Sequence, residues 1–222
     1  MANPEPLKTS KKFNALQIIF AITAFVLMWI GTLRCGFVKF TSTSGTSEPI
    51  SLQFGIWYYQ FFSVVFTVDG AFAFESCHGY PDWVSLDGSW KAARAFSVLT
   101  FIFSIIVLVT ACVSACAIAG TGRITFAWEA PVFLMVALFQ GLTLLLLNSN
   151  VCKNNLLIQD VTTKYPDIGF PDTCSLDTGA KLSISAMVFF FVASVSAFLA
   201  HKAENEEIKA EGESGLTEPL TA

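Results

Sequence analysis

Cysteine is the residue type whose chemistry stands out first in this chain. Four of its six cysteines, Cys35, Cys77, Cys152 and Cys174, lie outside the long apolar stretches, two in each of two long segments between them. Disulfides persist only on the oxidising side of a membrane, so this placement predicts one disulfide within each segment. The alternative is that all four remain reduced thiols on the cytosolic side.

The other two cysteines, Cys112 and Cys116, lie one helical turn apart near the end of an apolar stretch. Cysteine is small and tolerates apolar surroundings, so we expect both side chains to pack within a helix bundle. Palmitoylation of cysteines close to the membrane surface is the alternative interpretation.

Glu129 and Gln140 are the polar side chains that stand out in the third apolar stretch. A charged side chain is costly in lipid, so Glu129 is a candidate functional residue. It lies near the cytoplasmic edge, however, and we expect it to reach toward water or to pair with Arg123. Gln140 lies in the middle of the stretch beside Gly141, where small residues allow helices to approach closely.

The remaining side chains predict no catalytic or metal site. His78 and His201 are the only histidines, they fall on opposite sides of the predicted membrane, and no HExxH, CxxC or GxSxG motif occurs. We therefore expect a protein that is not an enzyme and that has no cofactor. Basic residues number 13 and acidic residues 17, so the excess of Lys and Arg that nucleic-acid binding requires is missing.

Long stretches without charge define the elements that carry these residues. Of the chain, 54% is hydrophobic and 14% charged, against about 25% charged in a soluble domain. A bilayer is crossed by about 20 apolar helical residues, and four stretches meet or nearly meet that length. The expected order is a cytoplasmic tail at residues 1–15, membrane helices at 16–33, 95–119, 126–147 and 182–200, a β-rich extracellular loop at 34–94, a cytoplasmic turn at 120–125, a second extracellular loop at 148–181 and an acidic, disordered cytoplasmic tail at 201–222.

The number of spans and the cysteines together predict the orientation. An even number of spans puts both termini on one side, and Lys8, Lys11 and Lys12 before the first span favour the cytoplasm. Basic residues also lie beside the spans on the other side, so the cysteine positions supply the independent support. We expect an integral protein of the plasma membrane whose partners are the bilayer and either itself or other membrane proteins.

The first loop has the pattern of β-strands. Asp69-Gly70 separates two β-rich runs, which is a strong signal for a hairpin, and the aromatic run before them predicts a third strand. The alternative for residues 54–68 is a fifth membrane-embedded segment, since the run carries no charge.

With this topology, the chain resembles the claudin and peripheral myelin protein superfamily as a distant relative. Gly55-Ile56-Trp57 is similar to the Gly-Leu-Trp of the family's first loop, and the run from Lys91 to Phe96, KAARAF, resembles the Gln-Ala-Ala-Arg-Ala-Leu that opens its second helix. The family's cysteine three residues after the tryptophan is Gln60 here, so Cys35 and Cys77 would supply a substitute closure of the loop. The chain's ending also differs from the family's usual PDZ-binding terminus.

The resemblance implies a fold and a function. The fold is an all-α membrane bundle of four transmembrane helices with an extracellular β-rich first loop, in which Gly55 and Trp57 anchor the sheet to the helices and Arg94 ties the loop to the second helix. The function is a claudin-like structural, adhesive or membrane-organising role at cell junctions through protein contacts. The alternatives are an auxiliary subunit of a channel or other membrane protein, and a small ion or solute transporter whose route is lined by Glu129 and Gln140.

Overall fold

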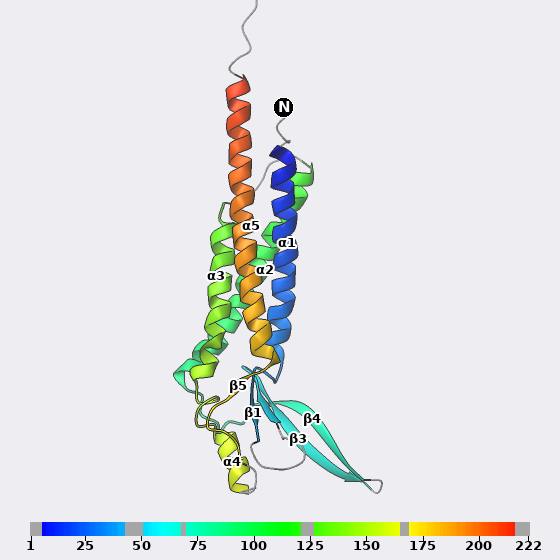
Figure 1. Cartoon of the computed structure of the whole chain (residues 1–222), viewed down its shortest axis with the longest axis vertical. Helices are drawn as coiled ribbons and strands as arrows, with labels where there is room; N and C mark the ends of the chain where they lie inside the picture. Colours follow the sequence, from blue (N-terminus) through cyan, green and yellow to red (C-terminus); the bar gives the residue numbers. More distant parts are fainter. Residues whose placement is uncertain (1–5, 43–50, 68–69, 121–126, 165–168, 216–222) are drawn as a thin grey trace, which may run out of the picture.

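The computed structural model of the protein describes residues 6–42, 51–67, 70–120, 127–164 and 169–215. In these residues, four helices are long and apolar enough to cross a membrane, over Lys12–Leu33, Gly88–Cys116, Glu129–Asn148 and Thr178–Glu206. Figure 1 shows the helices packed side by side, with the strands and a short helix gathered at one end, which we call the cap. The chain is therefore a multi-pass membrane protein whose helices contact the lipid bilayer.

Small residues set the packing of the helix bundle. Its helices are α1 (Pro6–Leu33), α2 (Gly88–Gly120), α3 (Glu129–Leu142), which continues as the 3-10 helix η1 (Thr143–Asn148), and α5 (Thr178–Gly215). The alanines Ala24, Ala186 and Ala193 are fully buried in the core of the bundle. A Cβ atom on Gly31 of α1 would lie 2.9 Å from the carbonyl oxygen of Gly179 in α5, so these two helices meet almost backbone to backbone.

The cap contains an antiparallel sheet, which has five strands in the described part of the chain, in the spatial order β4-β3-β2-β1-β5. The strands are β1 (Val38–Thr41), β2 (Ser51–Phe54), β3 (Tyr58–Thr67), β4 (Gly70–Gly79) and β5 (Ser175–Leu176). The prediction of a β-rich first loop is confirmed, but the sheet is larger than the three strands expected. The extra strands are β1, which directly follows α1, and β5, which the second loop adds beside it.

The predicted hairpin is formed by β3 and β4, which pair from Tyr58 opposite Gly79 to Thr67 opposite Gly70. Asp69, the first residue of the expected turn, lies outside the described residues. The alternative of a fifth membrane segment at residues 54–68 is wrong for Tyr58–Thr67, because these residues form a strand. Their aromatic and β-branched side chains favour an extended backbone whose hydrogen bonds are made to β4.

The second loop carries a helix that the sequence interpretation did not include, α4 (Leu156–Lys164). Asn155 caps it, since its side-chain oxygen accepts the backbone N–H of Leu157 at 3.0 Å and its amide donates to the carbonyl of Val151 at 2.8 Å. Ile158 of α4 is buried with the apolar side chains of the sheet. The helix is therefore held against the sheet at the far end of the cap (Figure 1).

Several expected boundaries differ from those of the structure. Helix α1 begins at Pro6 rather than at residue 16, and α2 begins at Gly88 rather than at residue 95. The expected cytoplasmic turn at 120–125 lies, beyond Gly120, outside the described residues. Charged and polar residues continue both helices beyond their apolar stretches, and a boundary set by apolar length alone misses these turns.

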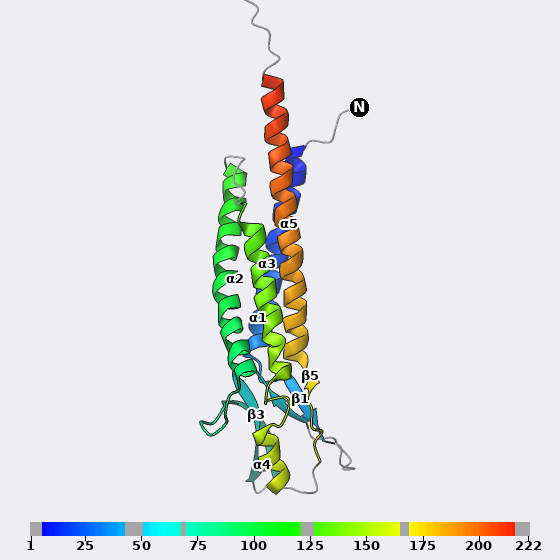
Figure 2. The ribbon, with the colours of Figure 1, turned by 90° about the vertical axis from the view of Figure 1, so that its left-hand side faces the viewer.

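The acidic tail expected to be disordered from residue 201 is helical as far as Gly215. Figures 1 and 2 show α5 continuing well past the ends of the other helices. The segment is rich in Ala, Glu and Lys, which are strong helix formers, and Lys202 lies 3.9 Å from Glu206 one turn later. Because the membrane span has already nucleated the helix, each further residue only has to extend it.

Candidate functional site

The junction between cap and bundle is the site that the structure assembles from the predicted motif residues. It begins at Asp87, which caps α2: its carboxylate accepts the backbone N–H of Trp90 at 3.0 Å. The second oxygen of the same carboxylate accepts the backbone N–H of Asn150 from the second loop at 3.1 Å. Asp87 therefore fixes the start of α2 and ties the two loops together.

Arg94, two turns into α2, faces a group of aromatic rings. Its Nε donates to the carbonyl oxygen of Ile56 at 2.9 Å. Its guanidinium carbon lies 5.0 Å from the ring centre of Trp57, 5.5 Å from that of Trp90 and 5.7 Å from that of Tyr80. These distances are within the range of cation–π attraction, so one side chain binds both the loop backbone and its aromatic surroundings.

The carbonyls of Gly55 and Ile56 receive further donors from the same aromatic group. Tyr80 donates its hydroxyl to the carbonyl of Gly55 at 2.8 Å, and the indole N–H of Trp90 donates to the carbonyl of Ile56 at 3.2 Å. Burial raises the pKa of the Tyr80 hydroxyl above its ordinary value, and the positive charge of Arg94 only partly offsets this. The hydroxyl therefore stays protonated and remains a donor.

Gly55 is held where no side chain fits. A Cβ atom there would collide with the carbonyl oxygen of Arg34 and would lie 2.9 Å from that of Tyr58. The backbone N–H of Gly55 donates to this same Tyr58 oxygen at 2.7 Å, closing a tight turn between β2 and β3. The end of α1 and the sheet can approach this closely only because position 55 has no side chain.

The structure thus brings Gly55, Trp57 and Arg94 together at one junction. We call these residues, with Tyr80 and Trp90, the anchor. The sequence interpretation missed Tyr80 and Trp90. A signal for Trp90 was present, because it precedes Arg94 by four residues and so shares its face of the helix. Nothing local in the sequence pointed to Tyr80, which depends on the path of the hairpin.

Both predicted disulfides are confirmed. Cys35 at the end of α1 is bonded to Cys77 in β4, and Cys152 is bonded to Cys174 just before β5. The second bond is accompanied by a hydrogen bond from the N–H of Cys174 to the carbonyl of Cys152 at 3.2 Å. One disulfide therefore closes each loop, and the first ties the cap covalently to the end of a membrane helix.

Glu129 is buried inside the bundle, which corrects the expectation that it reaches toward water. Gln17 of α1 donates to one carboxylate oxygen at 2.7 Å, and the hydroxyl of Ser114 in α2 donates to the other at 2.6 Å. Arg123, its expected partner, lies outside the described residues. Glu129 is also the first residue of α3, where the helix dipole favours negative charge. The hydrogen bonds to Glu129 therefore connect α3 with both α1 and α2.

Gln140 belongs to a second, separate polar cluster. Its side-chain amide nitrogen donates to the hydroxyl of Ser183 in α5, and its backbone carbonyl accepts the hydroxyl of Thr143 at 2.7 Å. All three side chains are fully buried. Glu129 and Gln140 are eleven residues apart, about 16 Å along a helix axis, so the two polar residues do not form one site.

The structure places Cys112 and Cys116 on the exposed face of α2, and both thiols are free. The expectation that they pack within the bundle is therefore wrong. Helix α2 instead buries Val107, Ala111 and Ser114, which recur at intervals of three and four residues along its inner face.

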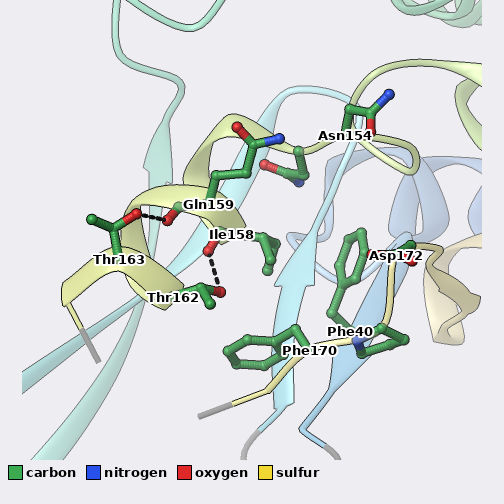
Figure 3. A pocket seen from close by; sticks show the side chains of 10 residues that line it. Phe40, Asn154, Ile158, Gln159, Thr162, Thr163, Phe170 and Asp172 are labelled. Carbon is green, nitrogen blue, oxygen red and sulfur yellow. Dashed lines mark hydrogen bonds between the residues drawn. The ribbon is translucent and has the colours of Figure 1, made fainter. Parts of the chain in front are cut away.

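The cap also contains a pocket of about 450 Å³ between α4 and the sheet (Figure 3). Its floor is apolar, formed by Ile158, Phe40 and Phe170, and its rim carries amides, hydroxyls and one carboxylate. The rim residues are Asn154, Gln159, Thr162, Thr163 and Asp172. No basic residue is among the described residues that line this pocket, so it favours neutral hydrogen-bonding groups over anions.

No family model matches the chain, and no curated protein is significantly similar to it.

Proposed function

We propose that this protein is a claudin-like membrane-organising protein, which acts through protein contacts made by its cap. The observation that carries the proposal is the anchor. Hydrogen bonds from Tyr80, Trp90 and Arg94 converge on two consecutive carbonyls of the loop, and a disulfide closes the same region. A cap held in this way has a defined position relative to the membrane, as an assembly built from repeated contacts requires.

The surface of the cap supports a role in protein contacts. Large apolar side chains are exposed there although they lie outside the membrane-spanning stretches: Trp83 is 57% exposed, Tyr58 41% and Leu176 39%. Tryptophan and tyrosine are enriched at protein interfaces, where they bury a large area at a small cost in side-chain entropy. The rim of the pocket beside α4, with its amides and hydroxyls, adds hydrogen-bonding groups to the same cap.

The disulfides support the orientation that this role requires. Both lie in the cap, and disulfides persist on the oxidising side of a membrane, which supports an extracellular position of the cap. Helix α1 begins and α5 ends at the opposite end of the bundle (Figure 1). In the proposed arrangement the cap is extracellular, both termini are cytoplasmic, and the protein resides in the plasma membrane.

The experiment is live-cell imaging of the full-length protein with a fluorescent tag at its C-terminus, expressed in cells that lack it. The proposal predicts that the protein concentrates into patches or at cell contacts without any added partner. A Trp83→Ser variant should disperse these patches at equal abundance. Trp128→Ser, which changes a tryptophan that is 38% exposed at the opposite end of the bundle, is the matched control and should leave them intact.

Diffuse wild-type protein would contradict the proposal. Patches that disappear when one other membrane protein is removed, together with stoichiometric copurification of that protein, would instead identify an auxiliary subunit. The transporter alternative has less support, because the buried polar atoms of Glu129 are already bonded to Gln17 and Ser114.

A further inference from the structure

A groove of about 240 Å³ lies between α1 and α2 at the cap end of the membrane spans. Met28 lies in it and is buried, and the aromatic rings of Trp29, Phe101 and Trp57 line it. We propose that this groove binds the ring system of a sterol from the surrounding bilayer. The proposal does not depend on the proposed function of the cap.

The groove is continuous with the lipid-contacting surface of the bundle. Trp29 and Val98, which line it, are 45% and 43% exposed, and the neighbouring Ile30 and Ile102 are exposed on the same two helices. An apolar hollow of this kind does not hold ordered water, because water needs two or more polar partners. In a bilayer the groove is therefore filled by part of a lipid.

The closed end of the groove selects among lipids. Trp57 lies at the cap end, where the guanidinium group of Arg94 is 5.0 Å from its ring centre. If a phospholipid chain occupied the groove, the Trp57 ring would obstruct the glycerol and phosphate groups attached to that chain. A sterol has only a hydroxyl at its polar end, so its rings can fill the groove beneath Trp57 while the hydroxyl lies at the membrane interface.

A polar atom is also present where the sterol hydroxyl would lie. Thr32, in the last turn of α1, lines the groove, and its hydroxyl oxygen is buried without a hydrogen-bond partner. Threonine in a helix adopts two common side-chain rotamers, which point its hydroxyl group in different directions. In the proposed complex, the sterol hydroxyl is the partner that this buried oxygen lacks.

The aromatic walls of the groove pack against each other. The rings of Trp29 and Phe101 lie 5.0 Å apart, centre to centre, and fix each other's positions across the two helices. A rigid ring system has less conformational entropy to lose on binding than a flexible acyl chain. A sterol is therefore favoured over the chain of a phospholipid.

The test uses the full-length protein in lipid nanodiscs with a photoreactive 3β-hydroxysterol that carries a diazirine on its ring system. After illumination, mass spectrometry locates the labelled residues. We expect labelling at the groove, on α1 and α2, and stronger competition by the unlabelled 3β-hydroxysterol than by its 3α epimer. Thr32→Val keeps the shape of the side chain and should weaken binding about fivefold, the value of one neutral hydrogen bond.

Val98→Trp fills the groove and should reduce labelling there at least tenfold. Val109→Trp is the matched control, because it places the same large side chain at another exposed valine of α2, which is 57% exposed, and should change nothing. Equal labelling of both variants would overturn the proposal. So would equal competition by phosphatidylcholine, which would identify the occupant as an acyl chain. Intact disulfides and monodisperse elution verify that each variant is folded, and Thr32→Val tests the proposal separately.

Discussion

Replacing Arg94 with methionine removes the side chain that connects the loop to α2 while keeping an unbranched apolar stem of similar length. The carbonyl of Ile56 keeps the indole N–H of Trp90 as a donor, so the substitution leaves no buried acceptor without a partner. What is lost is the hydrogen bond from the guanidinium group and its attraction to three aromatic rings.

The magnitude follows from these contacts. A hydrogen bond from a charged donor contributes about 1.5–3 kcal/mol. Cation–π attraction at a partly exposed position adds about 0.5–1 kcal/mol, and the three rings share one cation, so their contributions do not add in full. We expect Arg94→Met to lower the free energy of unfolding by about 2–4 kcal/mol. Arg94→Lys should cost less, because it keeps the charge but loses the planar donor.

The assay is reversible unfolding in mixed micelles, followed by tryptophan fluorescence. A double-mutant cycle separates the cation–π contact from general effects of each substitution. Combining Arg94→Met with Trp57→Leu should give a coupling energy of about 0.5–1 kcal/mol. Trp83→Leu provides the control cycle, because Trp83 is a largely exposed tryptophan of the same loop, and its coupling should be close to zero.

Two results would refute this reasoning. Arg94→Met without a measurable loss of stability would show that the anchor does not hold the cap. Equal coupling in the two cycles would show that the proximity of Arg94 and Trp57 has no energetic consequence.

Three further predictions concern the closure of the loops and the buried carboxylate. Gly55→Ala should prevent correct folding and surface delivery, because its methyl group would collide with backbone oxygens. Gly79→Ala should be tolerated, because the space around the new methyl group is open. Surface biotinylation distinguishes the two variants. Glu129→Ala should cost about 1–3 kcal/mol in the same unfolding assay and Glu129→Gln clearly less, because alanine leaves the buried amide of Gln17 without its acceptor, whereas Ser114 keeps the carbonyl of Thr110. Equal losses would show that the hydrogen bonds to Glu129 do not matter. Replacing both Cys152 and Cys174 with serine should lower the free energy of unfolding by about 3 kcal/mol. It should also remove the part of the protein's mobility difference between reducing and non-reducing gels that this disulfide causes. An unchanged stability would contradict the role given to this disulfide.

The spans were predictable because uncharged length is a strong signal that needs no tertiary information. The disulfides were predictable for a similar reason. Each loop contains two cysteines, so pairing within each loop is the simplest arrangement. The hairpin of β3 and β4 followed from the local pattern of β-rich runs around Asp69-Gly70. In each case the deciding information is local in the sequence.

What was missed depends on contacts between distant segments. Glu129 is buried because Gln17 and Ser114 approach it from other helices, and no pattern around Glu129 announces them. The exposure of Cys112 and Cys116 depends on which face of α2 turns inward. The helical tail was missed for a different reason. Its charged composition alone indicates disorder, but the membrane span before it has already nucleated the helix, which the tail only extends.

The most direct test of the proposed membrane-organising role is reconstitution of the purified full-length protein into lipid vesicles, with imaging of its distribution by freeze-fracture electron microscopy. No other protein is present in this experiment, so any order must come from contacts of the chain with itself. Our account predicts clusters or strands of particles for the wild type and dispersed particles for Trp83→Ser. Dispersed wild-type particles at every protein density would contradict it.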